Sequence, residues 1–342
     1  MKILYVLVSS ASDYYYEQAL ISMISAKHHM PGCVISLLTD SETYGYLKES
    51  CNLINEYVSE TNVIDLDNSL TPLQKSRWLK TSMRSLVNGD FLYVDVDTVF
   101  AAPINELLFT NDVMGVPDGN MPMNDHPMKD FIIKNLKKIQ FENSLDYHIN
   151  SGVLYFKDTS AAHAFAENWH KRWQESRKKG VFIDQPALHQ AIIDSGKILK
   201  LLPDYMNAQF GRNINTLANA VILHYYQSWT NDSVYIPAYK FLQEDWLKKF
   251  RDNPKSKIFQ KYIYNPKEAF DSNTFILGKK FNSFWNTRLL QHLMDLWNST
   301  NRADKRLFGI YENIIFIVRA IYYRLIKIAH PFYKAITSII HR

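Results

Sequence analysis

Cysteine is scarce in this sequence, which has only Cys33 and Cys51 among 342 residues. Two thiols cannot build a disulfide framework, and nothing near them supplies the spacing typical of zinc ligands. Both fit a reducing compartment as small, buried apolar residues.

Long apolar runs and phosphate-binding glycine loops are also missing. No stretch approaches the ~18 uncharged apolar residues that span a bilayer. The apolar run at 3–8 has no small-residue cleavage site after it, which predicts a first strand, not a signal peptide, and a cytoplasmic protein. Without G-x-G-x-x-G or G-K-[ST], the usual dinucleotide and ATP cradles are not indicated. No basic-aromatic platform indicates nucleic acid.

The composition is globular, with 46% apolar and 21% charged residues and a net charge of +5. Predicted strands at 2–8, 34–38 and 53–58 alternate with helices, which predicts an α/β fold with a parallel sheet and helices on both faces. Ligands of such sheets bind beyond the carboxyl ends of the strands. That edge would include Ser9 and Asp40.

An apolar strand predicted at 91–94 is followed by two aspartates, Asp95 and Asp97. If the strand continues, they share one face, and a divalent cation would relieve their repulsion. Such hard ligands suit Mg²⁺ or Mn²⁺, which keep positions open for substrate phosphates. The alternative is a solvated turn with two surface aspartates.

Arg77, Lys80 and Arg84 form one stripe of a helix predicted at 72–87. Such a stripe is often a solvated face. The sharper interpretation is that one of these cations meets a phosphate or a sugar.

The motif Asn150-Ser151-Gly152 lies at the mouth of an alternating strand. Its glycine permits the close approach of a ligand or another backbone. Its asparagine offers both a donor and an acceptor to a hydroxyl-rich substrate. An ordinary turn before a strand is the alternative.

Two further candidates are the pair Asp184-Gln185, which precedes a proline, and His224 at the end of a predicted strand. Asp184 is placed to cap a helix, which alone could explain it. A histidine that ends a strand is usually a structural hydrogen-bonder. Beside two aspartates it becomes a candidate third metal ligand.

These pieces, in this order, resemble retaining glycosyltransferases of the GT-A fold, closest to glycosyltransferase family eight and its bacterial relatives. The resemblance covers roughly residues 1–230 and rests on the strand at 2–8, Arg77, Asp95-Val96-Asp97, Asn150-Ser151-Gly152, Asp184-Gln185 and His224. It implies a GT-A-like single domain with a mixed, mainly parallel Rossmann-like sheet. Such a domain would move a sugar from a nucleotide-diphosphate sugar, most often a UDP-sugar, to a hydroxyl acceptor with retention.

The resemblance also implies roles for single residues. Asp95, Asp97 and His224 would hold Mn²⁺ (or Mg²⁺). The donor would be bound by Ser9, Arg77, Asp95, Asn150, Ser151 and Gly152, and the catalytic side chains would be Asn150, Asp184 and Gln185. In a retaining reaction the leaving phosphate oxygen can take the proton of the acceptor, whereas an inverting enzyme would need a base such as Asp184.

One departure from the family pattern concerns the run after His224. The family usually continues with Gly-x-x-Lys-Pro-Trp, whose lysine touches the diphosphate, whereas this chain has Tyr-Tyr-Gln-Ser-Trp229. We expect Lys240 or another cation to substitute, or leaving-group stabilisation to be weaker. The departure leaves the nucleotide and sugar open.

We divide the chain into a catalytic domain at 1–240, a helical extension at 241–305 and a basic amphipathic C-terminal helix at 306–342. Arg319, Arg324, Lys327 and Lys334 keep to one side of that helix. The segment suits an anionic membrane surface, or else packs on protein. Membrane binding at the inner face would suit a lipid-linked or glycan acceptor in bacterial surface glycan or lipopolysaccharide assembly.

Two other functions fit parts of the sequence. A haloacid-dehalogenase-like phosphatase would use Asp95 as its nucleophile, but the later acidic motif of that family is missing. A non-catalytic, membrane-associated scaffold with a degenerate transferase fold would explain the missing lysine. A homo-oligomer is compatible with the sequence, which leaves the oligomeric state open.

Overall fold

The computed structural model describes residues 1–225 and 239–270 and, beyond them, 292, 293, 296, 299, 301–318, 320 and 321. The chain forms two compact units, one of Met1–Asn231 with Ile236–Asn282 and one of Asp232–Tyr235 with Ser283–Arg342. The three-part division at 240 and 305 stays a prediction.

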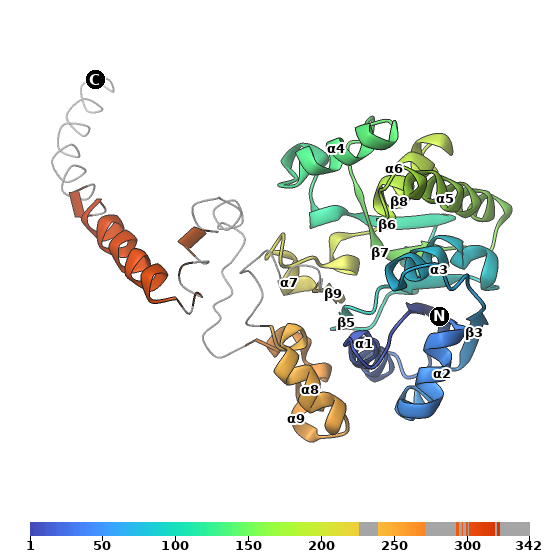
Figure 1. Ribbon diagram of the computed structural model, residues 1–342, viewed down its shortest axis with the longest axis horizontal. Helices are drawn as coiled ribbons and strands as arrows, with labels where there is room; N and C mark the ends of the chain where they lie inside the picture. The colour runs from blue at the N-terminus through green and yellow to red at the C-terminus, as the bar shows by residue number, and fades with distance from the viewer. Residues whose placement is uncertain are drawn as a thin grey trace, which may run out of the picture. The chain divides into compact units, whose positions relative to one another are not determined.

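The first unit is built on a seven-stranded sheet with the order β3-β2-β1-β4-β7-β6-β8 (Figure 1). A separate pair, β5 and β9, forms a two-stranded sheet. The strands are β1 (Lys2–Leu7), β2 (Val34–Asp40), β3 (Glu60–Ile64), β4 (Phe91–Val94), β5 (Thr98–Phe100), β6 (Val113–Pro117), β7 (Ile149–Phe156), β8 (Lys200–Leu201) and β9 (Ile222–His224).

Strand β7 runs against its neighbours β4 and β6, whereas β1 pairs in parallel with β2 and β4. The amino end of β7 therefore meets the carboxyl end of β4, with Val94 opposite Val153. This reversal brings two motifs far apart in the sequence to one edge of the sheet. The mixed, mainly parallel sheet predicted from the sequence is confirmed.

Helices lie in both units. Those of the first unit are α1 (Tyr15–His29), α2 (Ser41–Ser50), α3 (Pro72–Leu86), α4 (Lys129–Ile139), α5 (Ser160–Lys178), α6 (Gln185–Asp194), α7 (Thr216–Asn219), α8 (Glu244–Asp252) and α9 (Lys257–Tyr264). Helix α3 begins with a capping box between Thr71 and Gln74 and has a proline in its first turn. In the second unit, 302–318 are helical.

The main core lies between the sheet and the packed helices α3, α5 and α6. Phe165, Trp169 and Trp173 recur at four-residue spacing on α5 and are almost fully buried, so they form the face of this helix that packs on the core. Helix α8 is tied to α1 because Arg251 forms an ion pair with the buried carboxylate of Glu17. This packed core supports the rim, which is the edge of the sheet where the carboxyl end of β4 meets the amino end of β7.

One sequence prediction about a strand is wrong. The predicted strand at 53–58 holds a 3-10 helix, η1 (Asn52–Glu56), and the strand follows it as β3. Because β3 is an edge strand with little buried surface, it lacks the apolar run that marks central strands. The strand predicted at 91–94 is confirmed as β4. It ends there, so the condition under which the two aspartates would share one face is not met, and they lie in a turn before β5.

Within the described part of the chain, no helix is both long and apolar enough to cross a membrane. The helical residues 302–318 expose several large apolar side chains, among them Ile314, Phe316 and Val318. The predicted basic stripe of this segment, Arg319, Arg324, Lys327 and Lys334, lies outside the residues whose side chains are described.

Candidate active site

The turn after β4 carries the two aspartates, and β9 brings a histidine to them. Strand β5 pairs antiparallel with β9 so that Thr98 lies opposite His224. The backbone N–H of Tyr225 donates to the carbonyl of Asp97 over 3.0 Å. Although the aspartates do not share one face of a strand, this pairing sets His224 beside both of them.

Asp95, Asp97 and His224 offer three ligand atoms that lie within 4.8 Å of one another. Nε2 of His224 is 3.2 Å from Oδ1 of Asp97 and 3.9 Å from Oδ2 of Asp95. The imidazole is buried, whereas the two carboxylates are 23% and 19% exposed and so can be reached from outside. Two carboxylates and one imidazole form a donor set that fits Mn²⁺ or Mg²⁺.

Gly152 leaves room for this cluster. Its backbone carbonyl accepts from the N–H of Asp95 over 2.7 Å, which holds β7 against the turn. A Cβ at this position would lie 2.2 Å from Cε1 of His224 and 2.8 Å from Oδ2 of Asp95. No side chain fits such distances, so the predicted need for close approach has a concrete cause.

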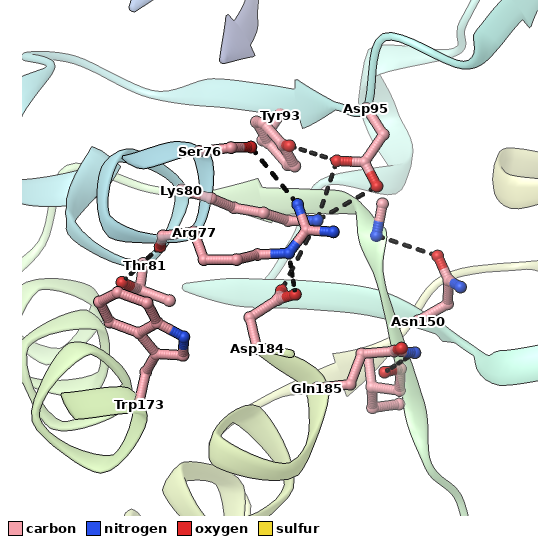
Figure 2. A network of polar contacts seen from close by, with 12 residues as sticks. Ser76, Arg77, Lys80, Thr81, Tyr93, Asp95, Asn150, Trp173, Asp184 and Gln185 are labelled. Carbon is pink, nitrogen blue, oxygen red and sulfur yellow. Dashed lines mark hydrogen bonds and ion pairs between the residues drawn. The ribbon is translucent and has the colours of Figure 1, made fainter. Parts of the chain in front are cut away.

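A second group of charges surrounds Asp95 from the side of α3 (Figure 2). The ammonium of Lys80 donates to both oxygens of Asp95, over 2.8 and 3.1 Å, and lies 3.6 Å from Asp184. Arg77 pairs with Asp184 over 3.0 Å. The hydroxyl of Tyr93 donates to Asp95 in a short hydrogen bond. Cations and carboxylates therefore alternate across the rim.

This network explains the charge state of Asp184. Burial alone would raise its pKa, but the nearby Lys80 and Arg77, with a hydrogen bond from Ser151, hold the pKa below its ordinary value. The side chain makes no capping hydrogen bond, although Asp184 occupies the N-cap position of α6. Capping, offered as an alternative from the sequence, does not explain this carboxylate.

The predicted cationic stripe of α3 is split between two tasks. Arg77 and Lys80 face the carboxylates of the rim. Arg84 instead donates to the carbonyls of Val87 and Gly89 and so closes the loop after the helix. Sequence spacing placed Lys80 on the stripe but gave no sign that it binds Asp95.

Asn150 and Gln185 line a pocket of about 240 Å³ next to the rim. Its other walls include apolar side chains of α4 and α6, together with polar ones; they are Asp118, Met128, Phe131, Ile132, Asn135, His148, Ile183, Pro186 and Arg212. A pocket with apolar walls and a few convergent polar groups is typical of a small-molecule site.

Two predicted edge residues have local partners. The hydroxyl of Ser9 donates to Asp13 over 2.6 Å and accepts from the N–H of Tyr16, at the start of α1. Asp40 caps α2 and pairs with Lys75 over 3.2 Å. These contacts are structural, and a role of Ser9 in donor binding stays a prediction.

Lys240 lies in a 3-10 turn, η7 (Lys240–Leu242), with its ammonium 5.1 Å from the centre of the Tyr262 ring. Its proposed substitution for the missing lysine stays a prediction. The run 226–229, where this chain departs from the family pattern, lies outside the described residues.

Comparison with known families matches residues 71–260 to nucleotide-diphospho-sugar transferases. The chain belongs to this family. The matched region contains α3, the two aspartates, the Asn150-Ser151-Gly152 motif and His224. The prediction of a nucleotide-sugar-dependent glycosyltransferase is thereby confirmed, and the phosphatase alternative falls away.

Solved structures that resemble this transferase include two glycosyltransferases. Galactosyltransferase LgtC in complex with donor and acceptor sugar analogues is 14% identical, with a TM-score of 0.46 over 73% of this chain and 96% of that one. Mouse xyloside xylosyltransferase 1 is 13% identical, with a TM-score of 0.43 over 66% of this chain and 97% of that one. No curated protein sequence matches.

Proposed function

We propose that this transferase is metal-dependent and moves a sugar from a UDP-sugar to a hydroxyl acceptor with retention of configuration. The observation that carries the proposal is the convergence of the Asp95, Asp97 and His224 ligand atoms within 4.8 Å, in a chain of this family. Mn²⁺ fits the donor set, and Mg²⁺ is the alternative. When bound, the ion would supply a Lewis acid that neutralises charge on the leaving diphosphate.

The residues of α3 would complete the charge balance of the donor site. Asp95, Asp97 and Asp184 contribute three carboxylates, against which stand the cations of Lys80 and Arg77. A divalent ion turns this surplus of negative charge into a positive one, which suits a diphosphate. Lys80 and Arg77 therefore hold the carboxylates in place and leave the ion to face the donor.

Retention is supported by the state of Asp184. An inverting reaction needs a base that takes the proton of the acceptor from the far face. Asp184 has a lowered pKa, and both its oxygens lie near the cations of α3, so it is a weak base. The leaving phosphate oxygen is then the better proton acceptor, and Asn150 and Gln185 would position the sugar and the attacking hydroxyl.

The pocket lined by Asn150 and Gln185 would receive the acceptor. Phe131 of α4 lines it and is half exposed, which offers an aromatic face to the apolar side of a sugar ring. We keep a glycan or lipid-linked acceptor as the proposed class, in bacterial surface glycan or lipopolysaccharide assembly at the inner face of the membrane. The exposed apolar side chains of 302–318 support contact with a lipid surface.

The first experiment is donor hydrolysis by the purified protein with a panel of UDP- and GDP-sugars, in Mn²⁺ or in EDTA. We expect one nucleotide to be released in Mn²⁺ only, and Asp97→Ala to lower the rate by about 100-fold or more. Asp252→Ala, at an exposed carboxylate of α8, is the matched control and should keep the rate. If neither hydrolysis nor Mn²⁺-dependent nucleotide binding is found, the scaffold interpretation replaces this proposal.

A second experiment tests retention. The product formed with an acceptor glycan is examined by proton NMR, where the coupling constant of the anomeric proton reports its configuration. We expect an α-linked donor to give an α-linked product. A β-linked product would contradict retention and assign the base to Asp184 or another carboxylate.

A further inference from the structure

A chain of hydrogen bonds links Asp118 to His224, the histidine of the candidate metal site, through two asparagines. Nδ2 of Asn150 lies 2.9 Å from Oδ1 of Asp118, and Nδ2 of Asn207 lies 3.0 Å from Oδ1 of Asn150. Oδ1 of Asn207 lies 3.0 Å from Nδ1 of His224. Asn207, Asn150 and His224 are all buried, so these bonds are shielded from water.

Only one direction of donation satisfies this chain. The carboxylate of Asp118 can only accept, so the amide nitrogen of Asn150 must face it. The backbone N–H of Gly152 donates to Oδ1 of Asn150 over 2.9 Å, which fixes the same orientation independently. Asn207 must then donate to Asn150 through its nitrogen and present its oxygen to His224. That oxygen can only accept, so Nδ1 of His224 carries a proton.

Asp118, at the other end of this chain of hydrogen bonds, also has a fixed partner in His126. Nδ1 of His126 accepts from the N–H of Met128 over 3.1 Å, so its proton lies on Nε2, which is 3.3 Å from Oδ2 of Asp118. Burial opposes ionisation of Asp118, but the contact with His126 and the hydrogen bond from Asn150 hold its pKa well below the ordinary value. Asp118 is therefore a fixed acceptor.

We propose that Asn207 is a positioning residue that holds His224 in the tautomer whose Nε2 lone pair faces Asp95 and Asp97. A histidine ligand needs that lone pair on the side of the metal, and the partner of the other ring nitrogen decides where it is. Asp118 and Asn150 act one step further out by fixing the orientation of Asn207. This inference rests on the proposed metal-dependent function.

The position of Asn207 gives the proposal a sharp test. Asn207→Leu keeps the volume but removes the acceptor for Nδ1 of His224. Asn207→Asp keeps an acceptor there but cannot donate to Asn150. A residue that only fills the core should tolerate leucine better than a buried charge, whereas a positioning residue should tolerate aspartate better.

The experiment measures Mn²⁺ affinity of the full-length protein by EPR of free Mn²⁺, without any donor sugar. We expect Asn207→Leu to weaken binding by about 10- to 100-fold and Asn207→Asp to remain within about threefold of the natural protein, as in other carboxylate–histidine–metal arrangements. Gln190→Leu is the control, because this buried amide bonds to Glu142 and Asp194, which lie outside this chain of hydrogen bonds. The unfolding transition in EDTA verifies that each variant folds.

Each outcome decides something different. If the natural protein binds Mn²⁺ and Asn207→Leu binds equally well, the positioning role is overturned while the proposed function stands. Equal losses in Asn207→Leu and Gln190→Leu would also overturn it, because the loss of any buried amide would then weaken Mn²⁺ binding to the same extent. If the natural protein does not bind Mn²⁺, the metal-dependent function and this inference both fall.

Discussion

The rim around Asp95 and the helical residues 302–318 depart from ordinary burial in opposite directions. At the rim, charged side chains are buried: Lys80 is 1% exposed and Asp184 is 3% exposed. In 302–318, large apolar side chains are exposed, and Phe316 is 73% exposed. Stability alone disfavours both arrangements, so each needs a physical explanation.

The two regions differ in what offsets the free-energy cost of buried charge at the rim and of exposed apolar side chains in 302–318. Within the rim, Lys80 and Arg77 pair with Asp95 and Asp184, so burial is offset by internal partners. The exposed side chains of 302–318 lose no hydrogen bond, but they gain free energy only when they leave water. Removal of one ion-pair partner should therefore destabilise the rim. Residues 302–318 should instead bind a surface that removes their apolar side chains from water.

The largest effect should come from Gly152→Ala. The added Cβ would overlap Cε1 of His224, so the cluster must shift. A displacement of about 1 Å costs roughly 100-fold in rate, and Mn²⁺ affinity should fall with it. Donor hydrolysis and Mn²⁺ titration measure both. Gly32→Ala, where a Cβ meets nothing within 4 Å, is the control; full activity in Gly152→Ala would refute the close-packed rim.

Lys80→Met should have the next largest effect. Removing one partner of a buried ion pair destabilises by about 3 kcal/mol, here because Asp95 and Asp184 would face each other without their shared cation. Mn²⁺ should restore part of this loss, since it supplies positive charge beside Asp95. Urea unfolding in EDTA and in Mn²⁺ measures the difference.

The matched control for that experiment is Lys171→Met, at an exposed position of α5. It should change the free energy of unfolding by less than about 0.5 kcal/mol. If Lys80→Met in EDTA changes the free energy of unfolding as little as Lys171→Met does, ion pairing is not what offsets the burial of charge at the rim.

Much of the rim was predictable because its motifs end or begin strands. Asp95 follows β4, Gly152 lies in the amino-terminal half of β7 and His224 ends β9, and the sheets bring these positions together. Helix α3 was equally predictable from its proline, its cap and its apolar spacing. The exact path was not, because the turn at Asp97 depends on the pairing of β5 with β9, a contact between segments far apart in the sequence.

What sequence reasoning missed are the supporting residues. Asn207 ends a short 3-10 turn, η5 (Asp204–Asn207), with no periodicity to mark it. Asp118 follows β6 in a stretch that reads as an ordinary loop. The bond from Lys80 to Asp95 depends on how α3 packs on the sheet, which spacing along one helix cannot give. Such roles arise only when tertiary packing decides which polar groups meet.

A pair of buried histidines, one of which lines the pocket next to the rim, should make the stability of the protein depend on pH. His148 and His189 are buried with their Nδ1 atoms 3.2 Å apart. Burial lowers the pKa of His148 to about 4 and that of His189 to about 3. The unfolded chain takes up these protons below about pH 6.5 but the folded chain does not until near pH 4, so the free energy of unfolding should fall as the pH drops through this window.

The expected slope is about 1.4 kcal/mol per pH unit for each histidine. Urea unfolding of the natural protein between about pH 4.5 and pH 7 should show this slope in the free energy of unfolding. Replacing both residues, as His148→Leu with His189→Leu, should flatten the curve. His163→Leu, at a partly exposed pair with Asp158, should not. An equally steep curve in the double variant would show that other groups carry the cost.

The smallest expected effect concerns the other side of the comparison, Phe316 in the helical residues 302–318. If this segment lies on an anionic membrane surface, burying one phenylalanine contributes about 1.5 kcal/mol or more, so Phe316→Asp should weaken binding to phosphatidylglycerol vesicles about tenfold or more. Asn313→Asp adds the same charge to the same helix without removing apolar area, and it separates the two causes. Flotation with phosphatidylcholine vesicles measures the apolar part alone. If the natural protein binds neither kind of vesicle, the membrane role of residues 302–318 is wrong, and their exposed apolar side chains pack on protein instead.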